Sequence, residues 1–215
     1  MATTENILQC AYRVQITVPG NDDINAIIEY LKNEIALKGI SSPSKKKAYN
    51  AITRYLKNSV GGHRDYIKYA KRHTHNGKEC QVFTDSYTFY RLYDPIDGLP
   101  DFDTEYKGNH EYFDFSKFMI DDFKNFQKTT VTKKDISLYI KTYDKSKLED
   151  KKVIFYAIDG FDDSNGKFTI NANYLNTAFD ILQSNTLDIY NMHKWWTIAK
   201  SDNGYVVICR IRRYE

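Results

Sequence analysis

The chain is organised around the segment FTINANYLNTAFDIL, residues 168–182, in which the spacing of apolar residues changes from alternating to helical. A short alternating run leads into Asn171, whose side chain can accept a hydrogen bond from the first free N–H groups of a helix. Apolar residues then recur every three or four positions as far as Leu182, which gives the helix one apolar face. The segment therefore predicts a strand followed by a helix that packs against a sheet.

Three more strands are predicted after this helix. Residues 187–190 alternate, residues 194–199 are rich in aromatic side chains, and residues 205–212 form the strongest strand pattern of the chain. Asp202-Asn203-Gly204 predicts a hairpin turn, because Asn and Gly tolerate the positive φ angles of tight turns. Residues 167–214 thus read as a strand, a helix and three strands.

The composition indicates a folded chain outside the membrane. Of its 215 residues, 41% are apolar and 15% aromatic, which argues against disorder. No apolar run approaches the roughly 20 residues of a membrane helix, and the first residues lack the pattern of a signal peptide. We therefore expect a cytoplasmic protein. Cys10, Cys80 and Cys209 are interpreted as small core residues.

The N-terminal part is predicted to be an appendage. Residues 12–18 alternate in the manner of a strand, and a helix is expected from Asn21 or Asp22 to Gly39. Ser41-Ser42-Pro43-Ser44 combines turn residues with a shift in composition. We place a boundary there, between a strand-helix appendage at residues 1–42 and a main domain at residues 43–215.

The middle of the chain repeats the order of its C-terminal unit. A helix at residues 45–57 is followed by a hairpin, residues 66–73 against 80–84, and by a strand at residues 87–93. A helix followed by antiparallel strands therefore occurs twice, which predicts the α+β class. Further elements are expected as a short helix at residues 115–126, a helix at 131–140 and a strand at 152–158.

Charge is segregated along the sequence. Residues 44–78 contain ten Lys or Arg and one acid, whereas residues 94–122 contain nine Asp or Glu and two Lys. This asymmetry predicts a basic side, on which cations neutralise phosphates and tyrosines stack on bases, and a separate acidic side. The predicted nucleic-acid contacts are Lys45, Lys46, Lys47, Arg54, Lys57, Arg64, Lys68, Lys71 and Arg72.

Together these elements resemble a domain of a DNA sliding clamp of the bacterial processivity type. The resemblance is carried by residues 168–182, by the closing strand at 205–212, and by residues 80–87, where a strand ends in a Thr-Asp turn and restarts. It covers about residues 45–214. It implies a helix backed by antiparallel strands, present twice, with basic helices that contact phosphates without reading sequence.

The resemblance also implies a place for partner peptides. Arg210 stands where the family usually has a proline, in the strand that helps to form the pocket for such peptides. Trp195 and Trp196 are adjacent, so on a strand one indole would lie outside the face that the helices cover. The predicted partner-binding residues are Trp195, Trp196, Arg210 and Arg212.

Catalytic and metal motifs are weak. The sequence lacks a phosphate-binding G-x-x-x-x-G-K-[ST] loop, a G-x-S-x-G nucleophile turn and an H-E-x-x-H zinc helix. His73, His75 and Cys80 have no fourth ligand at a fitting spacing, and Asp101 with Glu105 only superficially matches a nuclease carboxylate set. We therefore predict no catalytic residue, no metal site and no cofactor.

The sequence favours a non-enzymatic binding protein of clamp-like fold. We interpret it as a phage or mobile-element protein that engages a nucleic-acid-processing machine of a bacterial host cell, in replication or in host defence, for example as an anti-CRISPR-type inhibitor. The alternatives are an oligomeric DNA-binding processivity clamp and, third, a metal-dependent nuclease. Its expected partner is a host protein or nucleoprotein complex, with DNA, RNA or a second copy of the chain as alternatives and no membrane.

Overall fold

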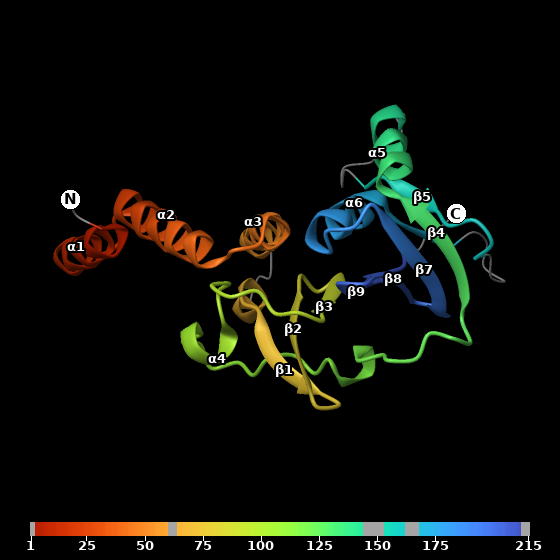
Figure 1. Cartoon of the computed structure of the whole chain (residues 1–215), viewed down its shortest axis with the longest axis horizontal. Helices are drawn as coiled ribbons and strands as arrows, with labels where there is room; N and C mark the ends of the chain where they lie inside the picture. Colours follow the sequence, from red (N-terminus) through yellow and green to blue (C-terminus); the bar gives the residue numbers. More distant parts are fainter. Residues whose placement is uncertain (1–2, 60–63, 144–152, 162–167, 212–215) are drawn as a thin grey trace.

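The computed structural model describes residues 3–59, 64–143, 153–161 and 168–211. Helices dominate the first quarter of the chain, and strands the rest (Figure 1). The helices are α1 (Thr4–Thr17), α2 (Asp22–Gly39), α3 (Pro43–Asn58), α4 (Phe102–Glu105), α5 (Lys133–Thr142) and α6 (Ala172–Ile181), with 3-10 turns at Asp65–Lys68 and Ser116–Phe118. The strands are β1 (Lys71–His75), β2 (Lys78–Thr84), β3 (Thr88–Leu92), β4 (Gln127–Thr132), β5 (Phe155–Ala157), β6 (Thr169–Asn171), β7 (Thr186–His193), β8 (Trp196–Ser201) and β9 (Gly204–Cys209).

Two three-stranded units join into one antiparallel sheet. Its strand order is β1-β2-β3-β9-β8-β7-β4, so the meander that follows α3 meets the meander that follows α6. They meet along β3 and β9, where Phe89 pairs with Val207 and Tyr90 with Val206. This arrangement confirms the predicted repeat of a helix and three strands, within the predicted α+β class. Strand β4 adds an edge, and β5 and β6 form a separate small sheet.

The two faces of the sheet have different covers. Helices α3, α6 and α5 lie side by side over one face, above the strands in Figure 1. Phe83, Tyr90 and Val206 point from the sheet into this layer. The other face, with Phe89 and Val207, is covered by residues 106–126, which we call the strap and which run below the sheet in Figure 1. The alternation of side chains along β3 and β9 supplies both faces with apolar residues.

Local capping explains where the predicted helices begin. The side chains of Asn171 and Thr132 accept hydrogen bonds from the backbone N–H groups of Asn173, at 3.1 Å, and Asp135, at 3.1 Å. Ser42 caps α3 in the same way, with Pro43 in its first turn, where a missing N–H costs nothing. These caps confirm the predicted starts of α3, α5 and α6 to within two residues.

The predicted strand at residues 12–18 is wrong, because these residues belong to helix α1. Thr3 caps this helix, because its side chain accepts a hydrogen bond from the backbone N–H of Asn6. The segment packs against α2 as part of a helix. Gln15 donates to Asn25 at 2.7 Å across the two antiparallel helices, and Lys32 lies over the ring of Tyr12. Tertiary contact thus overrides a two-residue period.

The predicted helix at residues 115–126 is also wrong. Only Ser116–Phe118 forms a 3-10 turn, and the rest of the strap is extended or turned. Asp114 and Asp122 accept hydrogen bonds from the backbone N–H groups two residues later, which competes with helix formation. The aromatic residues of the strap can then spread over the sheet instead of lining one side of a helix.

Three further expectations need correction. Cys10 and Cys209 are exposed, and only Cys80 is a core residue. The hairpin strand expected from residue 66 begins at Lys71, after a 3-10 turn. Of the strand expected at 152–158, residue 152 lies outside the described residues, and among the others Phe155–Ala157 forms β5.

The N-terminal pair α1–α2 extends from the side of α3, at one end of the molecule in Figure 1. Helix α2 contacts the rest of the chain through Asn33, whose side chain accepts a hydrogen bond from Tyr49 at 2.9 Å. Ile40, which follows α2, is part of the main core cluster. The boundary at residue 42 stays a prediction. Among the described helices, none has the length and apolar character needed to cross a bilayer.

Candidate functional site

The turn between β2 and β3 is held rigid by hydrogen bonds of the side chains of Thr84 and Asp85. Asp85 Oδ1 accepts hydrogen bonds from the backbone N–H groups of Tyr87, at 2.9 Å, and Thr88, at 2.7 Å. The hydroxyl of Thr84 donates to the carbonyl of Thr88 and accepts from the N–H of Ser86. These bonds hold Ser86 at a φ of +77°, which few residues other than Gly adopt. The turn therefore presents Tyr87 in one fixed position, with 61% of the residue exposed.

A small apolar cavity lies beside this turn, with a volume of about 130 Å³. Its lining comes from the turn, from the strap and from the end of β9. It is close in size to the roughly 150 Å³ that hold one benzene ring, so it fits one aliphatic or aromatic side chain. The lining includes Phe89, Phe113, Phe118 and Val207 as apolar groups, with Arg64, Tyr66, Tyr87 and Cys209 also contributing. We call this cavity the Tyr87 pocket.

Arg64 places a positive charge at the Tyr87 pocket. Its guanidinium donates to the hydroxyl of Ser86 at 3.4 Å, and the residue is exposed. An acidic group on a bound segment could pair with it. Cys209 is held on the opposite side, because its backbone N–H donates to the carbonyl of Tyr87 at 3.0 Å. That bond ties the closing strand to the turn.

A larger cavity of about 370 Å³ lies between α3, α6 and the same turn. Its charged groups include Arg54, Asp85 and Asp180. Asp85 already holds the turn and Asp180 forms an ion pair with Lys133, so both carboxylates are engaged within the fold. For this reason the smaller and more apolar Tyr87 pocket is the stronger candidate for an anchoring side chain.

The nine predicted nucleic-acid contacts divide into two groups. In the first group the cations are paired with acids: Lys45 with Asp94 at 2.6 Å, Lys57 with Glu29 at 3.3 Å, Lys71 with Asp103, and Arg72 with Glu79 and Asp97. In the second group, Lys46, Lys47, Arg54 and Lys68 are exposed and form no ion pair with any residue that the structure describes, and Arg64 lies at the Tyr87 pocket.

The acidic segment, expected on a side of its own, lies partly against the basic residues. Residues 94–103 fold back beside the basic hairpin, where the N–H of Ala70 donates to the carbonyl of Pro100 at 2.8 Å. Opposite charges that are distant in sequence become neighbours, and three of the nine predicted phosphate contacts are neutralised by acids of that segment. Attraction between the two segments explains why they meet.

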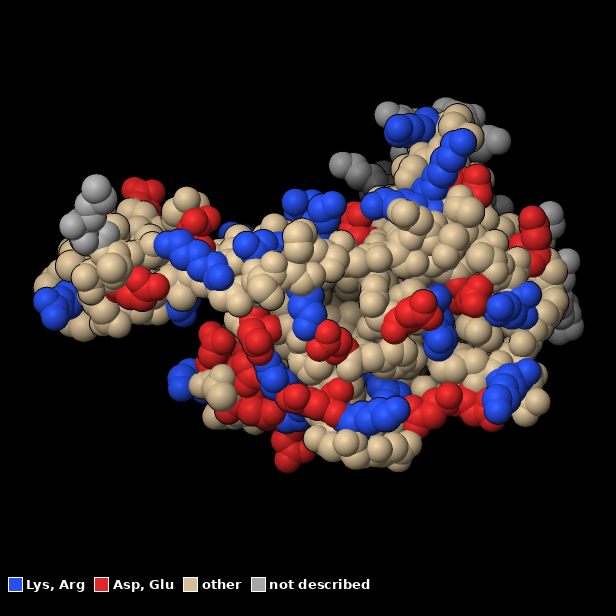
Figure 2. Space-filling model, in the orientation of Figure 1, with Lys and Arg blue, Asp and Glu red and all other residues tan. Residues whose placement is uncertain are grey.

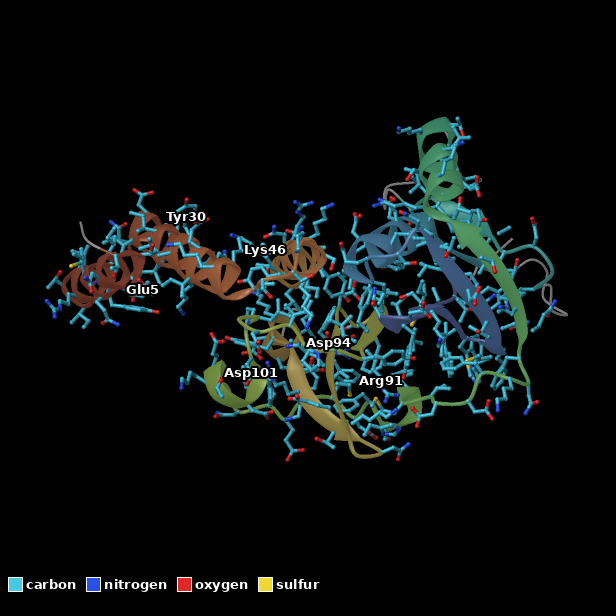
Figure 3. All side chains as sticks on the ribbon, viewed as in Figure 1. Glu5, Tyr30, Lys46, Arg91, Asp94 and Asp101 are labelled. Atoms are coloured by element: carbon cyan, nitrogen blue, oxygen red, sulfur yellow. The ribbon has the colours of Figure 1, made fainter. Side chains whose placement is uncertain are left out.

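A positive surface remains on the helical layer. Helix α3 carries five Lys or Arg and no acid, and α5 carries three Lys and one Asp. Figure 2 shows blue side chains along α3 and α5, whereas red side chains gather near α4. Figure 3 shows Lys46 on α3, above Asp101, which lies beside α4. The layer that covers one face of the sheet is thus its basic surface.

This chain resembles solved structures in its fold. No protein-family model and no curated protein sequence matches it. Solved structures do match, among them a DnaN sliding clamp from Bartonella birtlesii bound to griselimycin, at 14% identity with a TM-score of 0.55. The fold is clamp-like.

Two further clamps support this likeness. The DNA polymerase III subunit beta from Borrelia burgdorferi, in complex with a natural product, matches at 9% identity with a TM-score of 0.56. The Helicobacter pylori beta clamp bound to a DNA ligase peptide matches at 11% identity with a TM-score of 0.52. The matches cover 79%, 81% and 78% of this chain, and 65%, 62% and 63% of the Bartonella, Borrelia and Helicobacter chains. This chain thus spans less than two thirds of each clamp.

Within the clamp-like fold, the predicted partner-binding residues Trp195, Trp196 and Arg210 lie next to one another, at the start of β8 and the end of β9. The N–H of Arg210 donates to the carbonyl of Trp195 at 2.8 Å, a bond that a proline could not make, and its guanidinium lies 4.9 Å from the centre of the Phe168 ring. Trp195 is 41% exposed in the turn before β8, whereas Trp196 packs against Phe118 of the strap. Arg212 lies outside the described residues.

The weak metal and nuclease candidates have structural roles. The thiol of Cys80 donates to the carbonyl of His73 at 3.3 Å, and His75 Nε2 lies 2.8 Å from Asp121 Oδ2. Asp101 caps α4, and Glu105 accepts a hydrogen bond from the N–H of Asp101 at 3.0 Å. Within the described ranges, no three His, Cys, Asp or Glu side chains come together to hold a metal ion.

Sequence reasoning missed the Tyr87 pocket. The sequence does contain a signal for it in Thr84-Asp85, because a Thr-Asp pair between two strands indicates a turn held by side-chain hydrogen bonds. The strap residues Phe113 and Phe118 that complete the pocket gave no local signal. They reach it only by folding across the sheet.

Proposed function

We propose that this protein is a non-enzymatic clamp-like module that binds a protein of a nucleic-acid-processing machine through the Tyr87 pocket. One observation carries the proposal: an apolar cavity, sized for one side chain, lies between a rigid turn and the end of the closing strand β9. The proposal is supported by the resemblance to sliding clamps, in which the corresponding strand helps to form the pocket for partner peptides. A pre-formed site of this kind binds without the cost of ordering its own residues.

The similar structures support a peptide as the ligand. The Helicobacter pylori clamp is bound to a peptide of DNA ligase, so a related fold can hold a segment of a DNA-processing enzyme. In this chain, an extended segment would place an apolar side chain beside Phe89 and Val207 and an acidic group near Arg64. A host replication or defence complex, engaged by a phage or mobile-element protein, is the partner that we propose.

Replacing Tyr87 by alanine is expected to weaken peptide binding about 30-fold, because a central aromatic anchor contributes about 2 kcal/mol to an interface. The measurement is fluorescence anisotropy with the labelled DNA ligase peptide that binds the Helicobacter pylori clamp. Arg64→Ala should weaken binding less, and the loss should shrink in high salt. Tyr87 is exposed, so the fold should survive the change.

The matched control is Trp195→Ala, which removes another exposed aromatic residue away from the pocket. It should bind the peptide as the wild type does. Binding by the wild type that Tyr87→Ala leaves unchanged would refute the pocket, and so would the absence of binding to the wild type.

A second function is favoured by the free cations of α3. Lys46, Lys47 and Arg54 are exposed on the helical layer, where they could neutralise phosphates of DNA or RNA. This contact is compatible with a module that sits on a nucleoprotein complex. An oligomeric processivity clamp, the alternative function, would use the same contact with DNA. A monomeric mass in light scattering at micromolar concentration would exclude that alternative.

Changing Lys46, Lys47 and Arg54 together to alanine is expected to abolish most DNA retention at low salt. The slope of log K against log salt concentration should fall by about 0.9 for each lost contact with duplex phosphate. Lys128→Ala is the control, because Lys128 is already paired with Asp188. Unchanged DNA retention by the triple variant would exclude α3 as the DNA contact. Both variants should bind the peptide as the wild type does.

A further inference from the structure

The N-terminal helices leave one of their sides uncovered. Helix α1 packs along α2, and the antiparallel pair is held by bonds such as Gln15 to Asn25 and Lys38 to Thr4. None of the residues of α1 is fully buried. On another side, α2 contacts α3, where Lys57 pairs with Glu29 at 3.3 Å. The third side of α2 meets none of these elements.

Large apolar residues gather on this free side. Ile7 and Val14 of α1 are 46% and 47% exposed, and Ile27 and Tyr30 of α2 are 51% and 63% exposed. Of the ten large apolar residues that are exposed in the described chain, six lie between residues 7 and 30, and four of these six are on the free side. Such a concentration is unusual for a surface without a partner. Figure 3 shows Tyr30 on the helical pair, far from Arg91 in the sheet.

The two apolar stripes lie on the same side of the pair. Successive helical residues turn by about 100°, so Ile7 and Val14 are displaced by roughly a quarter turn from the side of α1 that meets α2. On α2, Ile27 is displaced by a similar angle from the side of the buried Ile28 and Leu31, and Tyr30 is displaced by about 60° more in the same sense. Because the helices are antiparallel and each displacement has the same sense, both stripes face one direction. Together the two stripes span the width of two helices.

Acidic residues lie at both ends of the stripe on α2. Asp23 precedes Ile27 by four positions and Glu34 follows Tyr30 by four, which places all four residues on one face. Asp23 is exposed and Glu34 is half-buried, and neither forms an ion pair with another residue of the described ranges. We call the surface formed by Ile7, Val14, Asp23, Ile27, Tyr30 and Glu34 the N-terminal face.

Charge decides what this face can bind. Helices α1 and α2 carry five acids and three bases, so a nucleic acid or an anionic lipid surface would be repelled. A second copy fits poorly, because antiparallel packing of α2 on α2 would bring Asp23 against Glu34 of the copy. Packing of α2 on α1 would leave both acids without a cation, since Ile7, Cys10 and Val14 supply none.

We propose that the N-terminal face binds an amphipathic helix of a partner protein, in which Lys or Arg residues flank an apolar stripe. The stripe of the partner covers Ile7, Val14, Ile27 and Tyr30, and its flanking cations pair with Asp23 and Glu34. A third helix on two parallel seams completes a small helical bundle. This surface is separate from the Tyr87 pocket and does not depend on it.

The test uses two synthetic helical peptides of 18 residues, which are about 27 Å long and therefore span the face. One has a leucine stripe flanked by lysines, and the other has the same stripe flanked by glutamates. Fluorescence anisotropy measures their binding to the full chain and to the double variant D23K/E34K. We expect the lysine peptide to bind the wild type, and the double variant to weaken it at least tenfold while gaining affinity for the glutamate peptide.

The exchange of preference is the decisive result, because a general loss of folding would weaken both peptides together. Glu5→Lys is the matched control, since Glu5 is an exposed acid of the same pair that lies off the stripe. Equal binding of the two peptides to the wild type would overturn the proposal, and so would no binding at a peptide concentration of about 1 mM. Self-association of the wild type that Tyr30→Ser abolishes, without peptide binding, would assign the face to a second copy instead.

Discussion

Replacing Gly204 by alanine lowers the expected free energy of unfolding by about 4 kcal/mol, which combines backbone strain with a steric clash. Gly204 has a φ of +150°, a conformation that L residues rarely adopt. A Cβ atom there would lie 2.2 Å from the carbonyl oxygen of Arg91 and 3.0 Å from the Cα of Leu92. Both atoms belong to the backbone of β3, so a side-chain rotation cannot relieve the clash.

The position of Gly204 makes this effect large. Gly204 begins β9 and pairs with Leu92 on one side and Ser201 on the other. It therefore stands where the two halves of the sheet join, and movement of β9 away from β3 would separate them. Thermal unfolding should show a midpoint lower by roughly 10 °C or more.

Gly77→Ala is the control for backbone strain alone. Gly77 has a φ of +74° in the turn between β1 and β2, and an added Cβ would meet no atom within 4 Å. This change should cost about 1 kcal/mol. Equal losses for the two variants would show that the close approach of β3 to β9 at Gly204 does not matter.

Replacing Arg91 by methionine is expected to release the strap from the sheet. The Arg91 side chain is 6% exposed, and its Nη1 donates to Asp121 Oδ1 at 2.9 Å and to the carbonyl of Ile120 at 3.4 Å. Its guanidinium also lies over the ring of Tyr205, whose hydroxyl donates to the carbonyl of Phe118. Methionine retains much of the packing volume but loses the charged bonds. The expected loss of stability is about 2–3 kcal/mol.

Hydrogen exchange should locate this loss in the strap. Backbone N–H groups between residues 112 and 123 should exchange faster in Arg91→Met, while those of α3 and α6 change less. Lys128→Met is the control, because its pair with Asp188 is exposed and contributes about 1 kcal/mol or less. Unchanged protection of the strap would show that its aromatic residues alone hold it on the sheet.

The same contact predicts how the strap responds to pH. Burial would raise the pKa of Asp121, but hydrogen bonds from Arg91 and His75 outweigh it and lower that pKa below its ordinary value. A carboxyl whose pKa is lowered by folding stabilises the fold fully above its unfolded pKa of about 3.9. This stability is lost as the pH falls through the lower, folded pKa. Protection of the strap should therefore fail below about pH 4, and at a higher pH in Arg91→Met.

The strap also links stability to the proposed binding site. Phe113 and Phe118 line the Tyr87 pocket, and the carbonyl of Phe118 is held by Tyr205. Arg91 thus supports the pocket from a distance without entering it. A variant that frees the strap should weaken peptide binding together with strap protection, whereas Tyr87→Ala should affect binding alone.

Much of the main domain could be predicted because its signals are local. The caps at Ser42, Thr132 and Asn171 lie next to the helices that they start, and the repeat of a helix and three strands is visible in the spacing of apolar residues. The pairing of β3 with β9 gave no such signal. It joins residues that are more than 110 positions apart, so it depends on the packing of both halves on one core.

The candidate sites were less predictable, because charge and exposure depend on neighbours that are remote in sequence. Lys45, Lys71 and Arg72 are as basic as Lys46 and Lys47 in the sequence, yet acids from residues 94–103 neutralise them. Trp196 packs against Phe118 of the strap, whereas its neighbour Trp195 is exposed. Neither distinction is encoded within a few residues of the side chain concerned.

Local interactions account for the helix at residues 172–181 with its Asn171 cap, for the strands that follow it, and for the Thr84-Asp85 turn. Contacts between distant segments make residues 12–18 helical and the strap extended. They also determine which cations are paired with acids. The difference comes from the distance in sequence over which each interaction acts. Caps and turns act over three or four residues, whereas burial and ion pairing depend on which distant segments the fold brings together.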